Sequence, residues 1–527
     1  MQQPRVVVVG SGPIGATYAR HIIENHPTAT VLMVELGPQL TPTPGLNVRN
    51  IADPEEKARA RMASQGPQAH SIEGRSPRLG IPAGTVVEGT FTARQGTHLI
   101  DFGGPGSGHA AGFPAAALST CVGGQGAHWT CATPRPAFSE KIPFIPGGEW
   151  DGLIEEAEAL LHTTHNAFSG SQVSGAIQAL LAEEFAGELP DGFGPQILPV
   201  AGDEPGDGTI RWTGTDVVFG PLLDATSPLG ARFELRPLTL AREILHERGR
   251  AVGVLLESRE SGRRAVEPAD LVIVAADAIR TPQLLWASRI RPPALGHYLT
   301  EHPAVLGTIA LRAESMRRFA DEDALAAERA RRALTPGDPI SAVNRIPFSE
   351  PAHPFAAQIM YTDTPPMPLP AGHPAAGGTW GYVNAGWGLR KFPRHEDAVT
   401  FSDDELDWAG MPAPSIRYEL TEREHAEIAQ ATALLKRAAG ALGEFVPGGE
   451  PRLMPNGSSL HYQGTIRMGE SDDGTSVCDP WSRVWGFRNL FVGGNGVIPT
   501  ATAVNPTLFS VALALRGARE CVRRLRE

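Results

Sequence analysis

The sequence predicts an α/β fold, with a parallel sheet near the N-terminus and a second, larger region of strands and helices. Three observations support this prediction. The β-branched run Val6–Val9 is followed by a glycine turn and a helical stretch at 16–23. A second apolar run at 31–35 completes a β-α-β unit. Strand-like and helix-like stretches then recur along the rest of the chain, as is typical of α/β proteins.

Composition narrows the class of protein. The 527 residues include 46 Lys and Arg against 58 Asp and Glu, which gives a formal net charge of −12. An acidic protein is not expected to bind nucleic acid or an anionic membrane surface broadly. Four cysteines without a CxxC pair are too few for a disulfide scaffold. No run reaches 18 apolar residues and no signal pattern opens the chain, so we expect a cytoplasmic protein without a membrane span.

Further elements are predicted from hydrophobic periodicity and from turn residues. Segment 41–100 is expected to be an extended connection and 101–135 a glycine-rich loop, because neither shows clear periodicity. Strands are expected at 231–240, 251–257, 271–276, 356–362, 380–388 and 490–492. Helices are expected at 150–162, 176–185, 281–288, 321–334, 422–442 and 506–525. A hairpin turn is expected at 247–249, and Pro282 is placed in the first turn of its helix.

The first β-α-β unit carries a dinucleotide-binding pattern. Gly10, Gly12 and Gly15 follow the first strand with GxGxxG spacing, and Glu35 ends the second strand. Gly10 permits a tight turn, Gly12 lets backbone amides approach a pyrophosphate, and Gly15 lets the helix pack closely on the strand. The helix N-terminus favours the phosphates, and a carboxylate at Glu35 suits ribose hydroxyls. One such Rossmann-like site in the whole chain favours a resident flavin dinucleotide over a flavin plus a nicotinamide partner.

Four segments together with this motif resemble the glucose–methanol–choline family of FAD-dependent oxidoreductases. They are Ala275–Leu285, His461–Gly469, Val484–Gly494 and Asn505–Thr507. The resemblance implies bound FAD and oxidation of an alcohol.

Within this family, further segments are similar to pyranose oxidases and bacterial glycoside 3-oxidases. They are Gly126–Arg135, Leu295–Pro303, Phe401–Asp403 and Met411–Pro412. The resemblance then implies oxidation of a secondary hydroxyl, at C3 or C2 of a pyranose sugar or glycoside, to a keto sugar. The electron acceptor would be O2, giving H2O2, or a quinone. Alternatives are an alcohol or sterol oxidase or dehydrogenase on another substrate, and a non-redox FAD-containing lyase.

Two residues carry the expected catalysis. His461 matches the catalytic histidine of the family, and an imidazole that titrates near neutral pH can take and return the hydroxyl proton. Asn505 matches the asparagine of the sugar-oxidase branch, and its amide can donate to a developing alkoxide. The alternatives are a structural histidine and an ordinary helix N-cap, with Pro506 as the first helical residue.

The resemblance also implies cofactor and substrate contacts. His128 matches the covalent flavin attachment site of fungal pyranose oxidases, with a non-covalent contact as the alternative. The expected cofactor-binding set comprises Gly10, Gly12, Gly15, Glu35, His128, Trp129, Thr130, Gly494, Asn505, Pro506 and Thr507. Candidate substrate residues are Gln358, Tyr361 and Trp380, although a regular strand can aim only one of Gln358 and Tyr361 at the flavin. Burial of the aromatic residues in an ordinary core is the alternative.

Two domains are expected, each built from separate chain segments. An FAD-binding domain would comprise 1–135, 225–300 and 455–527. A substrate-binding domain with a mixed sheet would comprise 136–224 and 301–454. The pair His162 and His165 has partial metal-ligand spacing, but no further ligand accompanies it, so no metal site is expected.

Overall fold

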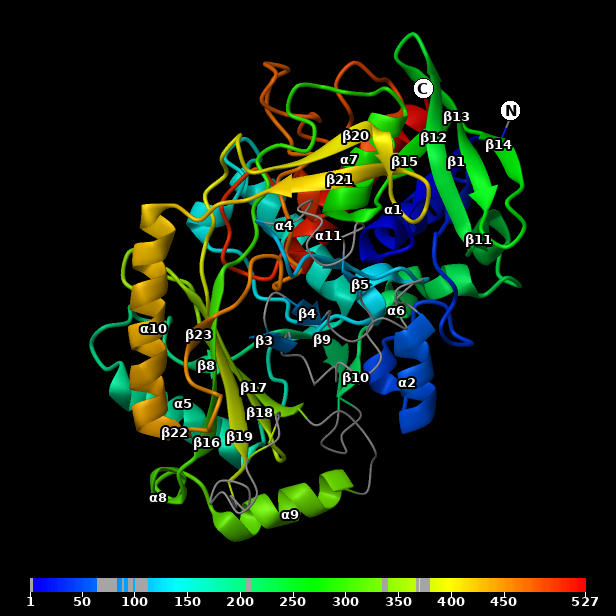
Figure 1. The fold of residues 1–527 in the computed structure, drawn as a ribbon. Coiled ribbons are helices and arrows are strands. Elements are labelled where there is room, and N and C mark those ends of the chain that lie inside the picture. The colour runs from blue at the N-terminus through cyan, green and yellow to red at the C-terminus, as the bar shows by residue number, and fades with distance from the viewer. Residues whose placement is uncertain are drawn as a thin grey trace.

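A five-stranded parallel sheet forms one half of the molecule (Figure 1). The computed structural model describes residues 3–63, 83–87, 90–92, 98–99, 112–204, 210–333, 340–365, 369 and 380–527. The strand order is β11-β2-β1-β15-β24, and every neighbouring pair is parallel. The strands are β1 (Arg5–Val9), β2 (Thr30–Val34), β11 (Phe233–Arg236), β15 (Leu271–Val274) and β24 (Leu490–Val492).

Helices cover this sheet because its central strands are apolar on both faces. All of Val6–Val9 and of Leu271–Val274 is buried. Helix α11 (Thr507–Leu525) packs against both α1 (Pro13–Asn25) and α4 (Gly147–Leu161). Strand β1 lies between β2 and β15, so the crevice at its carboxyl end is where such sheets bind ligands.

A second sheet is antiparallel at every described pairing, in the order β22-β16-β19-β18-β17-β8, with β23 also paired to β16. Helices α5 (Gln172–Glu184) and α10 (Glu422–Leu442) cover its outer face (Figure 1). The strands are β8 (Gln196–Ile197), β16 (Ala304–Leu311), β17 (Ile340–Ile346), β18 (Ala356–Thr362), β19 (Tyr382–Gly388), β22 (Gly443–Phe445) and β23 (Arg452–Leu453).

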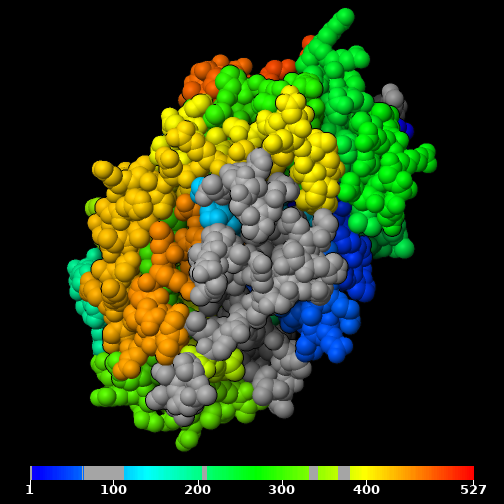
Figure 2. Space-filling view, in the orientation of Figure 1, coloured from blue at the N-terminus to red at the C-terminus, as the bar shows by residue number. Residues whose placement is uncertain are grey.

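Smaller elements complete the described part of the fold. The helices are α2 (Pro54–Ala63), α6 (Thr215–Phe219), α7 (Asp277–Ala287), α8 (Ala313–Met316) and α9 (Glu322–Ala333). The strands are β3 (Ala83–Val87), β4 (Thr90–Thr92), β5 (His98–Leu99), β6 (Ala117–Leu118), β7 (Thr163–Thr164), β9 (Val200–Asp203), β10 (Arg211–Trp212), β12 (Thr239–Glu247), β13 (Arg250–Ser258), β14 (Arg264–Pro268), β20 (Ala398–Leu406) and β21 (Pro412–Arg417). The β12–β14 sheet projects at one end of the molecular surface, and α10 forms part of one side of the molecule (Figure 2).

Most predicted elements are confirmed within a few residues, and the exceptions have local causes. The predicted strand 231–240 divides into β11 and β12, because Leu238 between them has φ +50°. The helix predicted at 281–288 begins earlier, at Asp277, so Pro282 lies inside α7. Pro282 has no N–H for the carbonyl of Ala278, and the Thr465 hydroxyl donates to that carbonyl instead, at 2.5 Å.

Two expectations about whole regions need correction. The predicted mixed sheet is antiparallel at all described pairings, because none of its neighbouring strands follows a parallel crossover. The supposed extended connection at 41–100 contains helix α2 and strands β3, β4 and β5. Its residues 64–82, 88–89, 93–97 and 100 lie outside the described residues. Strands β16, β17, β20 and β21 were not predicted; Gly307 interrupts the apolar pattern of β16.

The two sheets use separate parts of the chain. Every strand of the parallel sheet falls within 1–135, 225–300 or 455–527, and every strand of the large antiparallel sheet falls within 136–224 or 301–454. The division into two domains remains a prediction. None of the described helices has the length and apolar character needed to cross a membrane, and the cytoplasmic location also remains a prediction.

A buried histidine makes the stability of this fold depend on pH. His353 accepts a hydrogen bond from Trp387 Nε1 at 3.1 Å, and burial lowers the pKa of His353 to about 4. Because this pKa lies below the unfolded value of about 6.5, the unfolded chain binds more protons as the pH falls from about 6.5 toward 4. We expect His353 to reduce the free energy of unfolding by about 2 kcal/mol between pH 7 and pH 5.

Urea unfolding of the wild type and of His353→Gln at both pH values measures this contribution. Glutamine keeps an acceptor for Trp387 but does not titrate, so the wild type should lose about 2 kcal/mol more than the variant. Equal losses would show that His353 does not titrate as its burial implies.

Candidate active site

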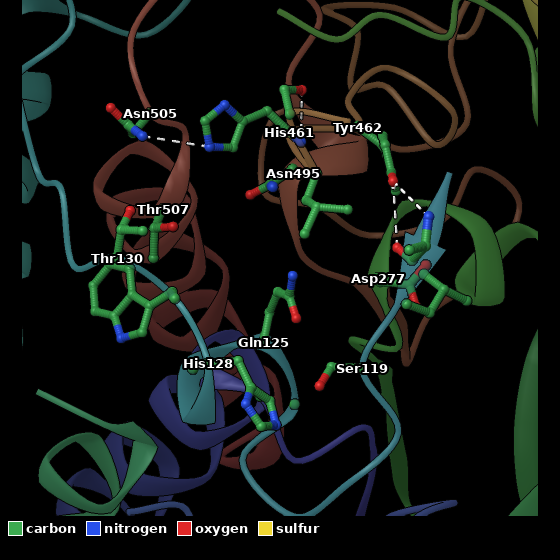
Figure 3. Close-up of a pocket in the computed structure, with 18 of the residues that line it drawn as sticks. Ser119, Gln125, His128, Thr130, Asp277, His461, Tyr462, Asn495, Asn505 and Thr507 are labelled. Atoms are coloured by element: carbon green, nitrogen blue, oxygen red, sulfur yellow. Dashed lines mark hydrogen bonds between the residues drawn. The ribbon is translucent and has the colours of Figure 1, made fainter. Parts of the chain in front are cut away.

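A cavity of about 680 Å³ extends from the carboxyl end of the parallel sheet to the inner face of the antiparallel sheet. Its lining includes the glycine turn after β1 at one end and His461 and Asn505 at the other. Figure 3 shows side chains from several distant chain segments surrounding one space. The cavity therefore joins the two parts of the predicted site.

The glycine turn has the geometry that the GxGxxG pattern predicts. Gly10 has φ +99°, and a Cβ there would lie 2.3 Å from the carbonyl oxygen of Ala275. A Cβ on Gly15 would lie 2.1 Å from the carbonyl oxygen of Gly10, whereas a Cβ on Gly12 would meet only Gly123 O, at 3.9 Å. Gly12 lines the cavity and is the N-cap of α1, without a side-chain cap. The helix N-terminus is thus open to an anionic group.

Glu35 lies beside this turn and is buried. Its Oε2 accepts hydrogen bonds from Ser11 Oγ at 2.7 Å and Ser11 N at 3.2 Å, and its Oε1 accepts from Gly37 N at 3.0 Å. Burial raises the pKa of Glu35, and these hydrogen bonds oppose the rise. Glu35 lines the cavity as an acceptor suited to hydroxyl groups.

The loop after β6 supplies another wall. His128, Trp129 and Thr130 line the cavity, and burial lowers the pKa of His128 to about 3, so its imidazole is uncharged at neutral pH. Trp129 is held by its Nε1–H, which donates to Thr213 O at 2.7 Å. Gln125 also lines the cavity, and its buried Oε1 has no hydrogen-bond partner among the described residues. That oxygen is available to a donor on a bound ligand.

His461 and Asn505 meet at the far end of the cavity. Asn505 Nδ2 lies 3.4 Å from His461 Nε2, as the dashed line in Figure 3 marks. Gln358 Nε2 donates to Asn505 Oδ1 at 2.5 Å, which turns the amide nitrogen of Asn505 toward His461. The two residues predicted for catalysis are therefore neighbours, although 44 positions separate them in the chain.

The residues around Asn505 differ from the expected helix start. Helix α11 begins at Thr507, and Pro506 is its N-cap, so Pro506 is not the first helical residue. The Asn505 side chain makes no cap hydrogen bond and faces Gln358 and His461 instead. Asn505, Thr507 and Gly494 line the cavity, whereas Pro506 is not among the lining residues.

The loop before His461 is held from several sides. Leu460 has φ +60°, a conformation that costs free energy for a residue with a side chain, so the surrounding contacts must maintain it. Glu301 accepts hydrogen bonds from Gly457 N at 2.5 Å and Ser459 Oγ at 2.7 Å, and Ser459 Oγ in turn accepts from His461 N at 3.2 Å.

Side chains on the antiparallel strands point alternately into the cavity and into the core, and this alternation separates the candidate substrate residues. Gln358 lies in the cavity lining with Met360 and Asn384. Tyr361 and Trp380 are fully buried in the core under α5 and α10 and are not part of the lining. Tyr361 Oη accepts from Arg329 at 2.7 Å and donates to Asp363 at 2.8 Å. The geometry therefore favours the core interpretation for Tyr361 and Trp380 and leaves Gln358 as the candidate.

Other polar groups of the lining were not predicted. Thr308 and Asn384, which are hydrogen bonded at 3.0 Å, and Arg452 project from the sheet into the cavity. His302 lies behind His461, with 3.0 Å between their Nδ1 atoms. A period-two pattern would have indicated Thr308 had β16 been predicted, and Asn384 lies within the strand predicted at 380–388. His302 lies within the Leu295–Pro303 segment that carries the resemblance.

The described residues contain no cluster of three or more potential metal ligands. His162 Nδ1 lies 3.1 Å from Asp203, and His165 Nε2 lies 3.3 Å from Glu158, so the two histidines have separate partners. All four cysteines are buried, and burial raises the pKa of Cys121, Cys478 and Cys521.

Comparison with known proteins agrees with this geometry. Models of the GMC oxidoreductase family match residues 221–304 and 393–514. The chain is 42% identical to a C-glycoside 3-oxidase of Microbacterium trichothecenolyticum, over 98% of this chain and 96% of that protein. It is 32% identical to a pyranose 2-oxidase of Tricholoma matsutake, over 98% of this chain and 93% of that protein.

The solved structures add evidence on the fold alone. The crystal structure of pyridoxine 4-oxidase from Mesorbium loti superimposes with a TM-score of 0.60, at 16% identity, over 98% of this chain and 99% of that chain. Three findings agree with one another: the sequence identity to relatives over nearly the whole chain, the two family matches and this shared fold. The chain belongs to the GMC oxidoreductase family, a family of enzymes whose cofactor is FAD.

Proposed function

We propose that this protein is an FAD-dependent glycoside oxidase that converts the C3 hydroxyl of a pyranose to a ketone. The observation that carries the proposal is the meeting of His461 and Asn505, 3.4 Å apart, at the end of a cavity that begins at the glycine turn. Identity of 42% to a C-glycoside 3-oxidase over nearly the whole chain supports this choice of substrate.

The residues present fit FAD at both ends of the cavity. The uncapped N-terminus of α1 at Gly12 and the hydrogen-bonded carboxylate of Glu35 suit the pyrophosphate and the ribose of the nucleotide half. The unpartnered Gln125 Oε1 suits an N–H donor of the ligand. His128, Trp129, Thr130, Gly494 and Thr507 complete the proposed cofactor site. When bound, FAD supplies the acceptor for the hydride that leaves the sugar carbon.

The protein's own groups handle the proton and the alkoxide. His461 Nε2 takes the proton of the substrate hydroxyl, because the uncharged imidazole offers a lone pair there. Asn505 Nδ2 donates to the alkoxide as charge develops on oxygen. Gln358 fixes the direction of this donor through its 2.5 Å hydrogen bond to Asn505 Oδ1.

The antiparallel sheet offers polar groups to the rest of the sugar. Thr308, Asn384 and Arg452 line the cavity on the same side as Gln358. Hydroxyl groups of a pyranose both donate and accept, so a lining that mixes amides, a hydroxyl and a guanidinium can orient one ring hydroxyl toward His461. We further propose that the two sheets belong to the FAD-binding and the substrate-binding domains that the sequence predicts.

An anaerobic titration tests the substrate class. We expect an O-glycoside or a C-glycoside to bleach the flavin absorbance, and NMR of the product to show a ketone at C3. The electron acceptor, O2 or a quinone, follows from which of them restores the absorbance. A ketone at C2 would instead assign a pyranose 2-oxidase activity, and no bleaching by any alcohol would favour the lyase alternative.

Removing the base separates proton transfer from cofactor binding. We expect His461→Ala to keep its flavin and to reduce it about 1,000-fold more slowly with substrate, since a positioned base contributes roughly 10²- to 10⁴-fold. Anaerobic stopped-flow absorbance measures the rate. His162→Ala, which removes a surface histidine paired with Asp203, is the control and should react like the wild type. An unchanged rate in His461→Ala would remove His461 from the mechanism.

Two glycine variants distinguish cofactor binding from folding. A Cβ on Gly12 meets protein only at 3.9 Å, so Gly12→Ala should fold normally while its methyl group occupies the cavity. We expect FAD affinity to fall about tenfold, or ~1.4 kcal/mol. Gly15→Ala places its Cβ 2.1 Å from Gly10 O and should lower the melting temperature instead. Equal FAD affinity of Gly12→Ala and the wild type would contradict the assignment.

Acid precipitation shows whether the flavin is covalently linked through His128.

A further inference from the structure

A second imidazole lies directly behind His461. His302 is buried, its ring meets that of His461 edge to face with centroids 4.9 Å apart, and the two Nδ1 atoms are 3.0 Å apart. An antiparallel bridge between Thr300 and Gln463 brings these two rings together. Because the segments run in opposite directions, the residue two positions after Thr300 lies opposite the residue two positions before Gln463, and these are His302 and His461. The arrangement is therefore built into the backbone pairing.

A single proton must lie between the two Nδ1 atoms, and its position decides whether His461 can act as a base. If His461 carries this proton, its uncharged ring has a lone pair on Nε2, which faces Asn505. If His302 carries it, an uncharged His461 must hold its own proton on Nε2 and cannot accept the substrate proton there.

Contacts at the cavity end favour the first arrangement. Gln358 donates to Asn505 Oδ1 at 2.5 Å, so Asn505 presents its N–H to His461 Nε2, which must then be an acceptor. The proton of the uncharged His461 ring therefore lies on Nδ1 and is donated to His302 Nδ1. Assigning nitrogens from the network in this way is the usual basis for a histidine tautomer.

The far side of His302 offers an acceptor for a proton on its Nε2. His302 Nε2 lies 3.0 Å from Thr502 Oγ1, which accepts its proton and donates to Gln463 Oε1 at 3.0 Å. Gln463 Nε2, which can only donate, is also 3.0 Å from His302 Nε2, and this contact would suit the opposite tautomer. In the proposed tautomer, Gln463 Nε2 donates to the His461 carbonyl alone, at 3.3 Å. Burial lowers the pKa of His302 to about 3, so this ring stays uncharged and keeps a lone pair on Nδ1.

We propose that His302 is a positioning residue that holds His461 in the Nδ1–H tautomer and so keeps His461 Nε2 unprotonated, which lets it accept the substrate proton. The inference deepens the proposed function and rests on it. When the substrate O–H bond breaks, the proton passes to His461 Nε2, and the Nδ1 proton stays on His461. The hydrogen bond to His302 then becomes charge-assisted and stabilises the imidazolium. His302 itself gains no proton.

Two substitutions separate this role from packing. His302→Asn offers an amide oxygen close to the position of Nδ1, whereas His302→Leu keeps bulk and removes the acceptor. Relative to the wild type, we expect the limiting rate of anaerobic flavin reduction to fall about 100-fold in His302→Leu and less than about tenfold in His302→Asn. The substrate Kd and the flavin content should change little in both variants. Equal losses in the two variants, or no loss in His302→Leu, would overturn the proposal.

The tautomers can also be measured without turnover. Nitrogen-15 NMR of histidine-labelled holoenzyme, with His302→Asn used for assignment, should show His461 protonated at Nδ1 and His302 at Nε2. The reverse pattern would overturn the proposal even if His302→Leu does not fold. If no glycoside reduces the wild-type flavin, the proposed function fails, whereas this measurement still decides the tautomer.

Discussion

The antiparallel bridge between Thr300 and Gln463 is the constraint on which the His461 end of the cavity depends. Thr300 N donates to Gln463 O at 3.0 Å, and Gln463 N donates to Thr300 O at 2.9 Å. The bridge fastens the segment that leads into β16 to the loop that carries His461. A shift of one residue would turn side chains to opposite sides and separate the two imidazoles. His461, the proposed base, is thus positioned by main-chain hydrogen bonds, which bulk solvent does not readily replace in a buried loop.

The antiparallel sheet serves the site and the core with the same strands. Residues with one parity, such as Gln358 and Asn384, face the cavity, and their neighbours Ile359 and Ala385 face α5 and α10. The polar face can therefore vary in sequence without disturbing the hydrophobic contacts beneath it. This separation suits a family in which substrate specificity differs between members that share one fold.

Features fixed by neighbouring residues could be predicted from the sequence, whereas features fixed by contacts between distant segments could not. The glycine turn is local, and its spacing sufficed to predict the positive φ of Gly10 and the close backbone approach at Gly15. The odd spacing of Gln358 and Tyr361 indicated that only one of them faces the cavity, but the strand alone could not say which; α5 and α10 on the other face decide it.

The remaining differences arise from contacts between distant segments. Pro282 indicated a helix start, but the Thr465 hydroxyl, 187 residues from Ala278, satisfies the carbonyl that an internal proline leaves without its helical partner. His302 was not predicted as a site residue, because its contact is with His461, 159 positions away in the chain. Asn505 resembled an N-cap until the position of Gln358 showed where its amide points.

If dioxygen accepts the electrons, the burial of the four cysteines protects their thiols from the hydrogen peroxide that forms. The thiolate is the form of cysteine that hydrogen peroxide oxidises, and burial disfavours that anion. Cys121 lines no part of the cavity although it lies 3.8 Å from His128, and a raised pKa keeps its sulfur protonated. A catalyst that released peroxide at every turnover would therefore carry its buried thiols in the form that resists inactivation by the product.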